Sequence, residues 1–261
     1  MLSAIVTAGG IPQPGEPLYP MTQGKCKALL EIAGKPMIQW VIDALEGSSK
    51  IQHIVIIGLP EDASVAGKKI RASLPNQEDM LANIRKGVQA VLEIDAGAHH
   101  VVVASSDIPG ITAEMVDWLV DTTMQTDEDV YYTVIERSVM EARYPESRRS
   151  YTRLKDVEVC GGDINVIRTM TVTANDAMWK RIIASRKNVF KQAALIGYDT
   201  LFLLLLRRIT LEQAVKTVAS RMKITGRAVL SPYAEMGMDI DKPHQFEMVD
   251  RDLQSKYGIA S

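Results

Sequence analysis

Short runs of apolar and β-branched residues alternate along the first half of the chain with longer stretches in which apolar residues recur every three or four positions. The short runs predict strands that are buried on both faces. The longer stretches predict helices, and Thr112 is expected to cap the third of them. The predicted strands are Leu2–Thr7, His53–Ile57, Val101–Ala104 and Val130–Ile135, and the predicted helices are Met37–Leu45, Met80–Val91 and Ala113–Thr123. Such alternation favours right-handed crossovers, so the pattern predicts an α/β fold with a mostly parallel sheet sandwiched by helices.

The pattern changes after about residue 136. A polar, arginine-rich segment at 143–155 precedes two adjacent glycines and a predicted strand at Ile164–Ile167. Helical patterns then cover 176–186, 191–208 and 211–223, ahead of a last predicted strand at Arg227–Leu230. No repeat or low-complexity linker divides the chain. We therefore expect a single domain over 1–261, with a helical insertion at about 174–224 in its C-terminal half.

The composition is that of a folded protein. Of the 261 residues, 46% are hydrophobic, which is enough to bury a full core and excludes a disordered or fibrous chain. The net charge of −2 provides no overall positive field, so we expect no nucleic-acid partner. Two cysteines and four scattered histidines have the spacing of neither a disulfide framework nor a zinc cluster. The longest apolar run, 201–206, is far shorter than the ~20 residues that span a bilayer, and we expect a cytoplasmic protein.

Two glycines follow the first predicted strand and begin the candidate chemistry. The strand continues into Ala8, Gly9 and Gly10, and a proline-rich loop then ends at Lys27. Glycines at the carboxyl end of a first parallel strand let a ligand approach the backbone, and their N–H groups can bind an anion. The spacing fits neither a dinucleotide fingerprint nor a P-loop. Taken alone, the two glycines are equally compatible with a surface turn.

Four segments, in this order along the chain, resemble the GT-A-like nucleotidyltransferases, notably their MobA-like branch. They are Ala4–Gly10 with Lys27–Ile38, then Asp79–Val88, Val101–Thr112 and Met238–Phe246. The resemblance implies a Rossmann-like fold with a nucleotide-binding half at 1–135 and an acceptor-binding half at 136–261. Two features depart from the family pattern. The usual arginine-containing loop is replaced by a longer proline-rich one, and Cys26 stands where proline usually precedes the lysine.

The resemblance assigns the nucleotide to the first three segments. The glycine loop, residues 8–10, wraps the nucleotide, and Lys27 neutralises the phosphates of that nucleotide. Asn83 takes the place of the small polar residue beside the base, although a helix cap is the alternative interpretation. The nucleotide-binding residues implied in this way are Ala8, Gly9, Gly10, Lys25, Asn83 and Ser106, with Lys25 supplying a second positive charge.

A divalent cation, Mg²⁺ or Mn²⁺, is the implied cofactor. Asp107 follows an apolar strand and resembles the family's metal-binding aspartate, with a helix-capping role as the alternative. The second ligand comes from the fourth segment, where we expect only one of two aspartates to face the site, Asp241 being preferred to Asp239. Lys27 and Asp107 are the expected catalytic residues, at an exposed edge of the sheet. Nucleotidyl transfer depends on charge neutralisation and in-line positioning, which one cation between two carboxylates and a lysine can supply.

The arginine-rich segment and the glycines after it are the candidate acceptor site. Arginine forms bidentate hydrogen bonds with phosphate, and small residues allow a close approach to the backbone. In the resembling family the acceptor binds in this region. The candidate residues are Arg149, Arg153, Gly161, Gly162 and Asp163, and a solvated surface is the alternative interpretation.

The expected function is a Mg²⁺-dependent nucleotidyltransferase that joins an NMP from an NTP to a small, phosphorylated acceptor and releases pyrophosphate. A narrower alternative is a sugar-phosphate or alditol-phosphate nucleotidyltransferase. An alternative of another class is a catalytically silent nucleotide-binding regulatory protein. The apolar stretch 193–208 fits the core or a homodimer interface, and it also fits contact with a membrane or a lipid-linked acceptor because lysines and arginines flank it.

Overall fold

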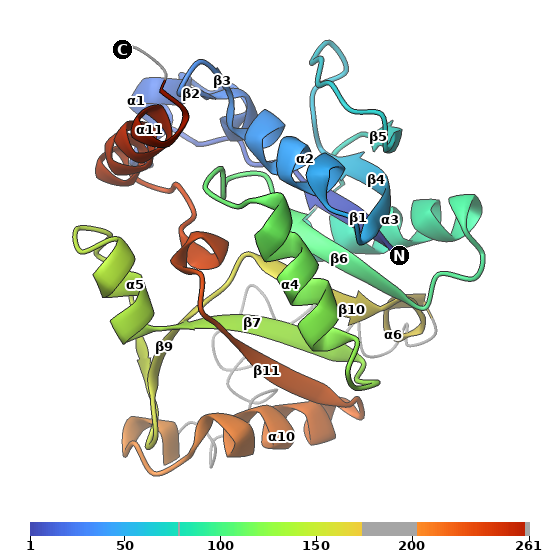
Figure 1. Ribbon diagram of the computed structural model, residues 1–261, viewed down its shortest axis with the longest axis vertical. Coiled ribbons are helices and arrows are strands. Elements are labelled where there is room, and N and C mark those ends of the chain that lie inside the picture. Colours follow the sequence, from blue (N-terminus) through green and yellow to red (C-terminus); the bar gives the residue numbers. More distant parts are fainter. Residues whose placement is uncertain (78, 174–202, 259–261) are drawn as a thin grey trace.

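The computed structural model describes residues 1–77, 79–173 and 203–258. These residues form a mixed, mostly parallel sheet flanked by helices (Figure 1), as the sequence predicts. The strands of the sheet are β1 (Leu2–Thr7), β4 (Ile51–Ile57), β5 (Ile70–Leu74), β6 (His100–Ser105), β7 (Val130–Glu136), β8 (Thr152–Arg153), β9 (Glu158–Gly161), β10 (Ile164–Arg168) and β11 (Gly226–Ser231). The helices are α1 (Tyr19–Thr22), α2 (Met37–Gly47), α3 (Met80–Ile94), α4 (Ala113–Thr123), α5 (Arg137–Arg143), α6 (Thr169–Thr173), α10 (Leu211–Met222) and α11 (Pro243–Tyr257). Two 3-10 turns, η1 (Lys27–Leu29) and η2 (Ala234–Gly237), and a hairpin of β2 (Glu31–Ile32) and β3 (Lys35–Pro36) complete the described elements.

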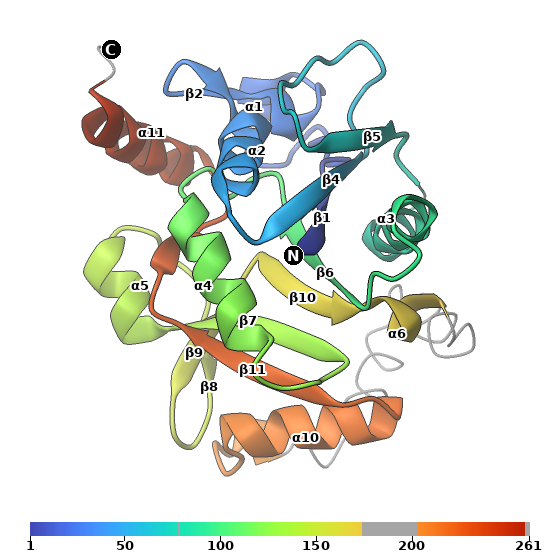
Figure 2. The ribbon, with the colours of Figure 1, turned by 45° about the vertical axis from the view of Figure 1, so that its right-hand side comes forward.

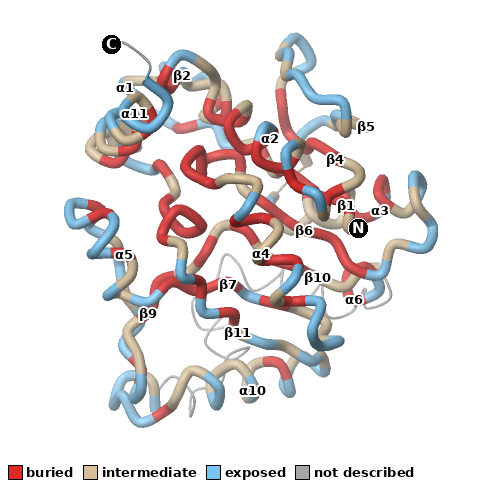
Figure 3. Tube along the Cα trace, in the orientation of Figure 1, coloured by how far each residue is buried: buried red, intermediate tan, exposed pale blue. Residues whose placement is uncertain are grey.

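The central strands are buried on both faces, as their unbroken apolar sequences predict (Figure 3). In β1, Ala4 and Val6 pack on the face covered by α2 and α4. Ile5 points to the other face and packs against α3. Figure 2 shows α3 on the side of the sheet opposite α2 and α4. Gly87 allows α3 to lie close to β1, because a Cβ at this position would come within 2.6 Å of the Ile5 side chain.

The sheet order is β5-β4-β1-β6-β10-β7-β9-β8, and β11 pairs with the other edge of β7. β10 is antiparallel to both β6 and β7, whereas β4, β1 and β6 are parallel to one another. β9 and β10 pair with different halves of β7 and are joined by Gly162 and Asp163. The start of β10 therefore lies at the same edge of the sheet as the ends of β1 and β6.

Most elements predicted in the described part of the chain are confirmed. The sequence does not predict several others, among them β5, α5 and α11, although Phe246, Val249 and Leu253 of α11 recur at helical spacing. Thr112 is the N-cap residue of α4, but its hydroxyl is hydrogen-bonded to the Glu114 carboxylate and does not cap a backbone N–H.

Most of the predicted helical insertion lies outside the described residues. Only α10 and the segment from 203 onward can be compared with the prediction, and Leu205 is 78% exposed. Among the described residues, no helix is both long enough and apolar enough to cross a bilayer.

Candidate active site

The glycine loop is held against the neighbouring strand by close backbone packing. The Ala8 N–H donates to the Ile57 carbonyl at 2.7 Å. Gly58 follows β4 with a φ of +99°, and a Cβ on it would lie 2.5 Å from the nitrogen of Gly9. The Cys26 thiol is buried and donates to the Ala8 carbonyl at 3.0 Å, and burial raises its pKa. Cys26 is therefore a packing residue that anchors the loop.

Lys27 connects the glycine loop to two carboxylates. Its backbone N–H donates to the Gly10 carbonyl at 2.8 Å. Its side-chain Nζ lies 2.6 Å from both Asp107 Oδ2 and Asp241 Oδ1. The Lys27 and Asp107 side chains are only 15% and 12% exposed, so the expected exposed location is wrong. Burial alone would lower the pKa of Lys27, but attraction to Asp107 and Asp241 outweighs it and raises this pKa above its ordinary value.

Three carboxylates converge beside Lys27 at the end of β6. One oxygen each of Asp107, Asp239 and Asp241 lies within 4.8 Å of the others. The expectation that only one of Asp239 and Asp241 faces the site is wrong, because residues two apart in an extended segment point the same way. Ile240, between them, is fully buried, and its N–H donates to the Asp107 carbonyl at 3.0 Å. This hydrogen bond fixes the C-terminal segment against the end of β6.

Asp163 and Arg149 border the carboxylate cluster on the side of β10. The Asp163 carbonyl accepts a hydrogen bond from the Ser105 N–H at 2.8 Å. Arg149 forms an ion pair with Asp239, and its Nη2 lies 3.8 Å from Asp163 Oδ2. Burial and the charge of Asp107 raise the pKa of Asp163 to about 7, despite the nearby Arg149.

The charges of this cluster suit a divalent cation. The cluster of Asp107, Asp239 and Asp241 and the bordering Asp163 together provide four carboxylates. These are in contact with two cationic side chains, Lys27 and Arg149. Full ionisation therefore leaves an excess of two negative charges. Asp107 Oδ1 is buried without a hydrogen-bond partner among the described residues. Carboxylate oxygens are the ligands that Mg²⁺ and similar hard cations prefer, so the residues present fit such an ion.

The other candidate acceptor residues do not contact the cluster. Arg153 is paired with Glu158 at 3.3 Å within the β8–β9 hairpin. Arg143 is paired with Glu235 and Asp252. Gly161 and Gly162 are needed for packing on β7, because a Cβ on Gly162 would lie 2.9 Å from the Thr133 side chain. Of the arginine-rich segment, only Arg149 contacts the cluster.

Asn83 lies in the first turn of α3 and is buried. It is not the helix cap, because Asp79 accepts hydrogen bonds from the N–H groups of Leu81 and Ala82. The Asn83 amide instead contacts the loop between β5 and α3. Its Nδ2 donates to Asn76 Oδ1 at 2.8 Å, and its Oδ1 accepts from the Gln77 N–H at 2.8 Å. Asn76 was missed in the sequence, where it appears as one polar residue of a loop.

The remaining nucleotide candidates are Ser106 and Lys25. Ser106 is buried, and its N–H donates to the Thr7 carbonyl at 3.1 Å. Lys25 is exposed, and among the described residues it forms no ion pair with the carboxylate cluster. A cavity of about 550 Å³ opens between the proline-rich loop and Lys27, with Gly10, Asp241 and Lys242 in its wall. A ligand in this cavity would lie beside Gly10 of the glycine loop and Asp241 of the carboxylate cluster.

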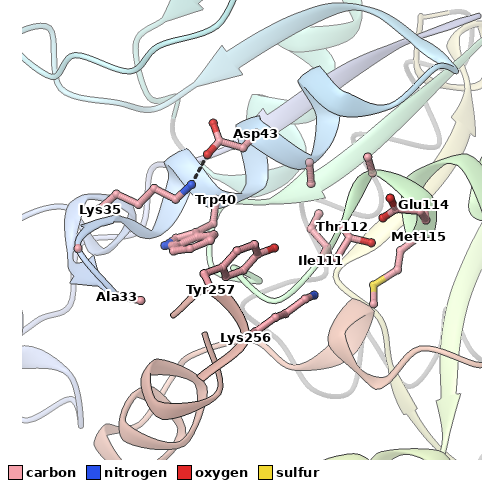
Figure 4. A pocket seen from close by; sticks show the side chains of 13 residues that line it. Ala33, Lys35, Trp40, Asp43, Ile111, Thr112, Glu114, Met115, Lys256 and Tyr257 are labelled. Carbon is pink, nitrogen blue, oxygen red and sulfur yellow. Dashed lines mark hydrogen bonds and ion pairs between the residues drawn. The ribbon is translucent and has the colours of Figure 1, made fainter. Parts of the chain in front are cut away.

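A larger cavity, of about 940 Å³, lies elsewhere, between the starts of α2 and α4 and the end of α11 (Figure 4). Trp40 and Tyr257 lie with ring centroids 4.9 Å apart along its wall, and Lys35 is paired with Asp43. None of the described residues that line it belongs to the carboxylate cluster. We therefore place the candidate active site at the smaller cavity, where phosphate-binding groups and metal-binding groups meet.

Comparison with known proteins identifies the family. The model of the MobA-like NTP transferase domain matches residues 5–205. The chain belongs to the MobA-like NTP transferase family. A hypothetical transferase from Thermus thermophilus is 28% identical, with a TM-score of 0.81 over 94% of this chain and 99% of that one. The sequence resemblance is thus confirmed, and the MobA-like chain is a nucleotidyltransferase.

Two more distant structures share the fold of this MobA-like transferase. A CMP:2-keto-3-deoxy-manno-octonic acid synthetase in complex with CTP is 16% identical, with a TM-score of 0.58 over 98% of this chain and 100% of that one. A 4-diphosphocytidyl-2C-methyl-D-erythritol synthase from Anaerococcus prevotii is 13% identical, with a TM-score of 0.56 over 97% of this chain and 96% of that one. At these identities the likeness establishes the fold alone.

Proposed function

We propose that the protein transfers an NMP from an NTP to a small, phosphorylated acceptor and releases pyrophosphate, with Mg²⁺ or Mn²⁺ as cofactor. The observation that carries this proposal is the contact of Lys27 with both the glycine loop and the carboxylates of Asp107 and Asp241. The groups that suit a triphosphate and those that suit its cation thus lie within one cavity. Membership of the MobA-like NTP transferase family supports the reaction class but not the choice of base or acceptor.

In this reaction an acceptor oxygen attacks the α-phosphorus, and the bond to the pyrophosphate oxygen breaks. Lys27 neutralises charge on the phosphates and orients them against the glycine loop. Asp107, Asp239 and Asp241 would hold the divalent cation, which would neutralise further charge on the triphosphate. Charge neutralisation and positioning account for most of the rate in such transfers, so no protein nucleophile is needed.

The acceptor is proposed to bind on the side of Asp163 and Arg149. Arg149 is largely buried and already occupies an anionic environment, and its guanidinium can form two parallel hydrogen bonds with a phosphate. A sugar phosphate or alditol phosphate is the narrower form of this proposal. The silent regulatory alternative is disfavoured, because a binding-only protein does not need three converging carboxylates beside a lysine.

A screen of pyrophosphate release tests the proposal. Each of the four NTPs is combined, with Mg²⁺ or Mn²⁺, with pools of sugar phosphates, phosphorylated alcohols and phosphorylated cofactor precursors. We expect release with one combination, and loss of release in Asp107→Asn. In Arg149→Lys, the KM for the acceptor should rise more than the KM for the NTP, because lysine lacks the planar guanidinium that forms two parallel hydrogen bonds with a phosphate. NTP binding without release in any combination would support the silent alternative instead.

A further inference from the structure

The side chain of Asn76 lies directly over the glycine loop. A Cβ on Gly9 would overlap the amide of Asn76, so only glycine leaves room for that amide. The loop that carries Asn76 is held in place from β5, because the Gly58 N–H donates to the Leu74 carbonyl at 2.8 Å. Gly58 in turn packs against the backbone of Gly9. Asn76 therefore lies against the glycine loop, although it is distant from Gly9 in the sequence.

The orientation of the Asn76 amide follows from a chain of hydrogen bonds that begins at a backbone N–H. The Gln77 N–H is necessarily a donor, so the atom of Asn83 that it contacts is the oxygen, Oδ1. The other amide atom of Asn83 is then the donor Nδ2, and its partner on Asn76 is the acceptor Oδ1. Asn76 is left with Nδ2, a donor, for any other partner. Asn76 as a residue is exposed, so a ligand can reach its side chain.

We propose that Asn76 reads the nucleobase and that Asn83 is a positioning residue that determines which atom of Asn76 is presented. This inference rests on the proposed function, in which a nucleotide binds over the glycine loop. It reassigns the role expected for Asn83, which is buried and has both amide atoms engaged within the protein. The exposed residue next to the ligand site is Asn76.

A presented N–H donor selects a base that carries a carbonyl oxygen. Cytosine, uracil and guanine each have at least one ring carbonyl, whereas adenine has none and carries an amino group that is itself a donor. The N–H of Asn76 therefore forms a hydrogen bond with the three carbonyl-bearing bases and faces a donor or a weaker ring acceptor in adenine. Loss of one such hydrogen bond corresponds to about a 3- to 10-fold change in affinity.

The test measures equilibrium binding of ATP, CTP, GTP and UTP by calorimetry, with Mg²⁺ and without an acceptor. For the wild type we expect ATP to bind more weakly than at least one carbonyl-bearing nucleotide by about 3- to 10-fold. Asn76→Ala should abolish this ratio. Asn83→Asp keeps the acceptor for the Gln77 N–H but replaces the donor with an oxygen, so the Asn76 amide should turn over and present its own oxygen. The ratio should then shift towards ATP.

Gln77→Ala is the matched control. It lies on the same loop, its side-chain Nε2 donates to the Pro75 carbonyl, and its backbone N–H is retained. Its base ratios should equal those of the wild type. Unchanged base ratios in Asn76→Ala would overturn the inference while leaving the proposed function intact. A uniform loss of affinity in Asn83→Asp, without a shift in the ratio, would refute the positioning role. Failure of all four nucleotides to bind to the wild type would overturn the proposed function itself.

Discussion

Replacement of Lys27 by methionine separates the electrostatic role of this residue from its packing. The substitution retains an apolar side chain but removes the ammonium that lies 2.6 Å from Asp107 and from Asp241. Removing one partner of a buried ion pair typically costs about 3–5 kcal/mol, whereas an exposed pair contributes about 0–1 kcal/mol. Asp107 is 12% exposed, but Asp241 is 58% exposed. Because the Lys27 pair with Asp107 is not fully buried, we expect a loss of about 2–4 kcal/mol in the free energy of unfolding without a divalent cation.

Activity and stability should respond differently to the cation in this variant. Without Lys27 the excess negative charge of the cluster increases by one, so Lys27→Met should bind Mg²⁺ more tightly and regain much of its stability. The ammonium is still missing from the phosphates, so kcat should remain lower by about 10²–10³ at saturating Mg²⁺. Chemical denaturation with and without Mg²⁺ gives the first quantity, and pyrophosphate release gives the second.

Lys35→Met is the control, because the Lys35 ion pair with Asp43 borders the larger cavity. Its kcat should match that of the wild type. If Lys27→Met kept near wild-type turnover, or if Mg²⁺ stabilised it less than it stabilises the wild type, the assignment of Lys27 to a shared phosphate and cation site would be wrong.

Three further predictions concern other parts of the structure. The pKa of Asp163 is raised in the folded state from 3.8 to about 7, so the contribution of Asp163 to stability is lost as the pH rises from about 4 to 7. Without a metal ion, Asp163→Asn should reduce the fall in the free energy of unfolding across this pH range by about 1–2 kcal/mol, allowing for partial exposure of the side chain. An unchanged dependence of this free energy on pH would contradict the prediction. Gly237→Ala should lower the free energy of unfolding by about 1–3 kcal/mol, because the new Cβ would overlap Ile135 and lie 2.9 Å from the Gly161 carbonyl oxygen; urea denaturation that shows no loss would show that η2 can move. Leu205→Glu tests the membrane interpretation of the apolar stretch 193–208. A lipid-binding surface predicts a folded variant that no longer sediments with anionic liposomes, whereas wild-type protein that never sediments with them excludes this contact.

The sequence predicts the central sheet well because its strands are buried on both faces and leave unbroken apolar runs. It predicts the amphipathic helices for a related reason, since one face of each must be apolar. The β5 strand was missed because its residues alternate between intermediate and exposed positions and form no such run. The short α5 helix carries one buried residue, Met140, which is too little for a periodic pattern.

Hydrophobic patterns alone could not predict the candidate active site. Spacing alone cannot bring Lys27 and Asp241 together, and the resemblance to a family supplied that pairing. Burial of Lys27 and Asp107 could not be foreseen, because it depends on the C-terminal segment that Ile240 anchors across the end of β6. The sequence also could not predict which arginine contacts the carboxylate cluster. Arg143 and Arg149 differ only in the partners that the fold brings to them.

The contact between Lys27 and Asp241 joins positions 214 residues apart in the chain. Contacts of such long range carry a high loop-closure cost, so we expect this one to form late in folding. A cation held by Asp107, Asp239 and Asp241 would therefore bind only after both ends of the described chain have come together. Interactions that are absent from the transition state slow unfolding without accelerating folding. Saturation of this site with a divalent cation should thus lengthen the lifetime of the native state while leaving the refolding rate nearly unchanged.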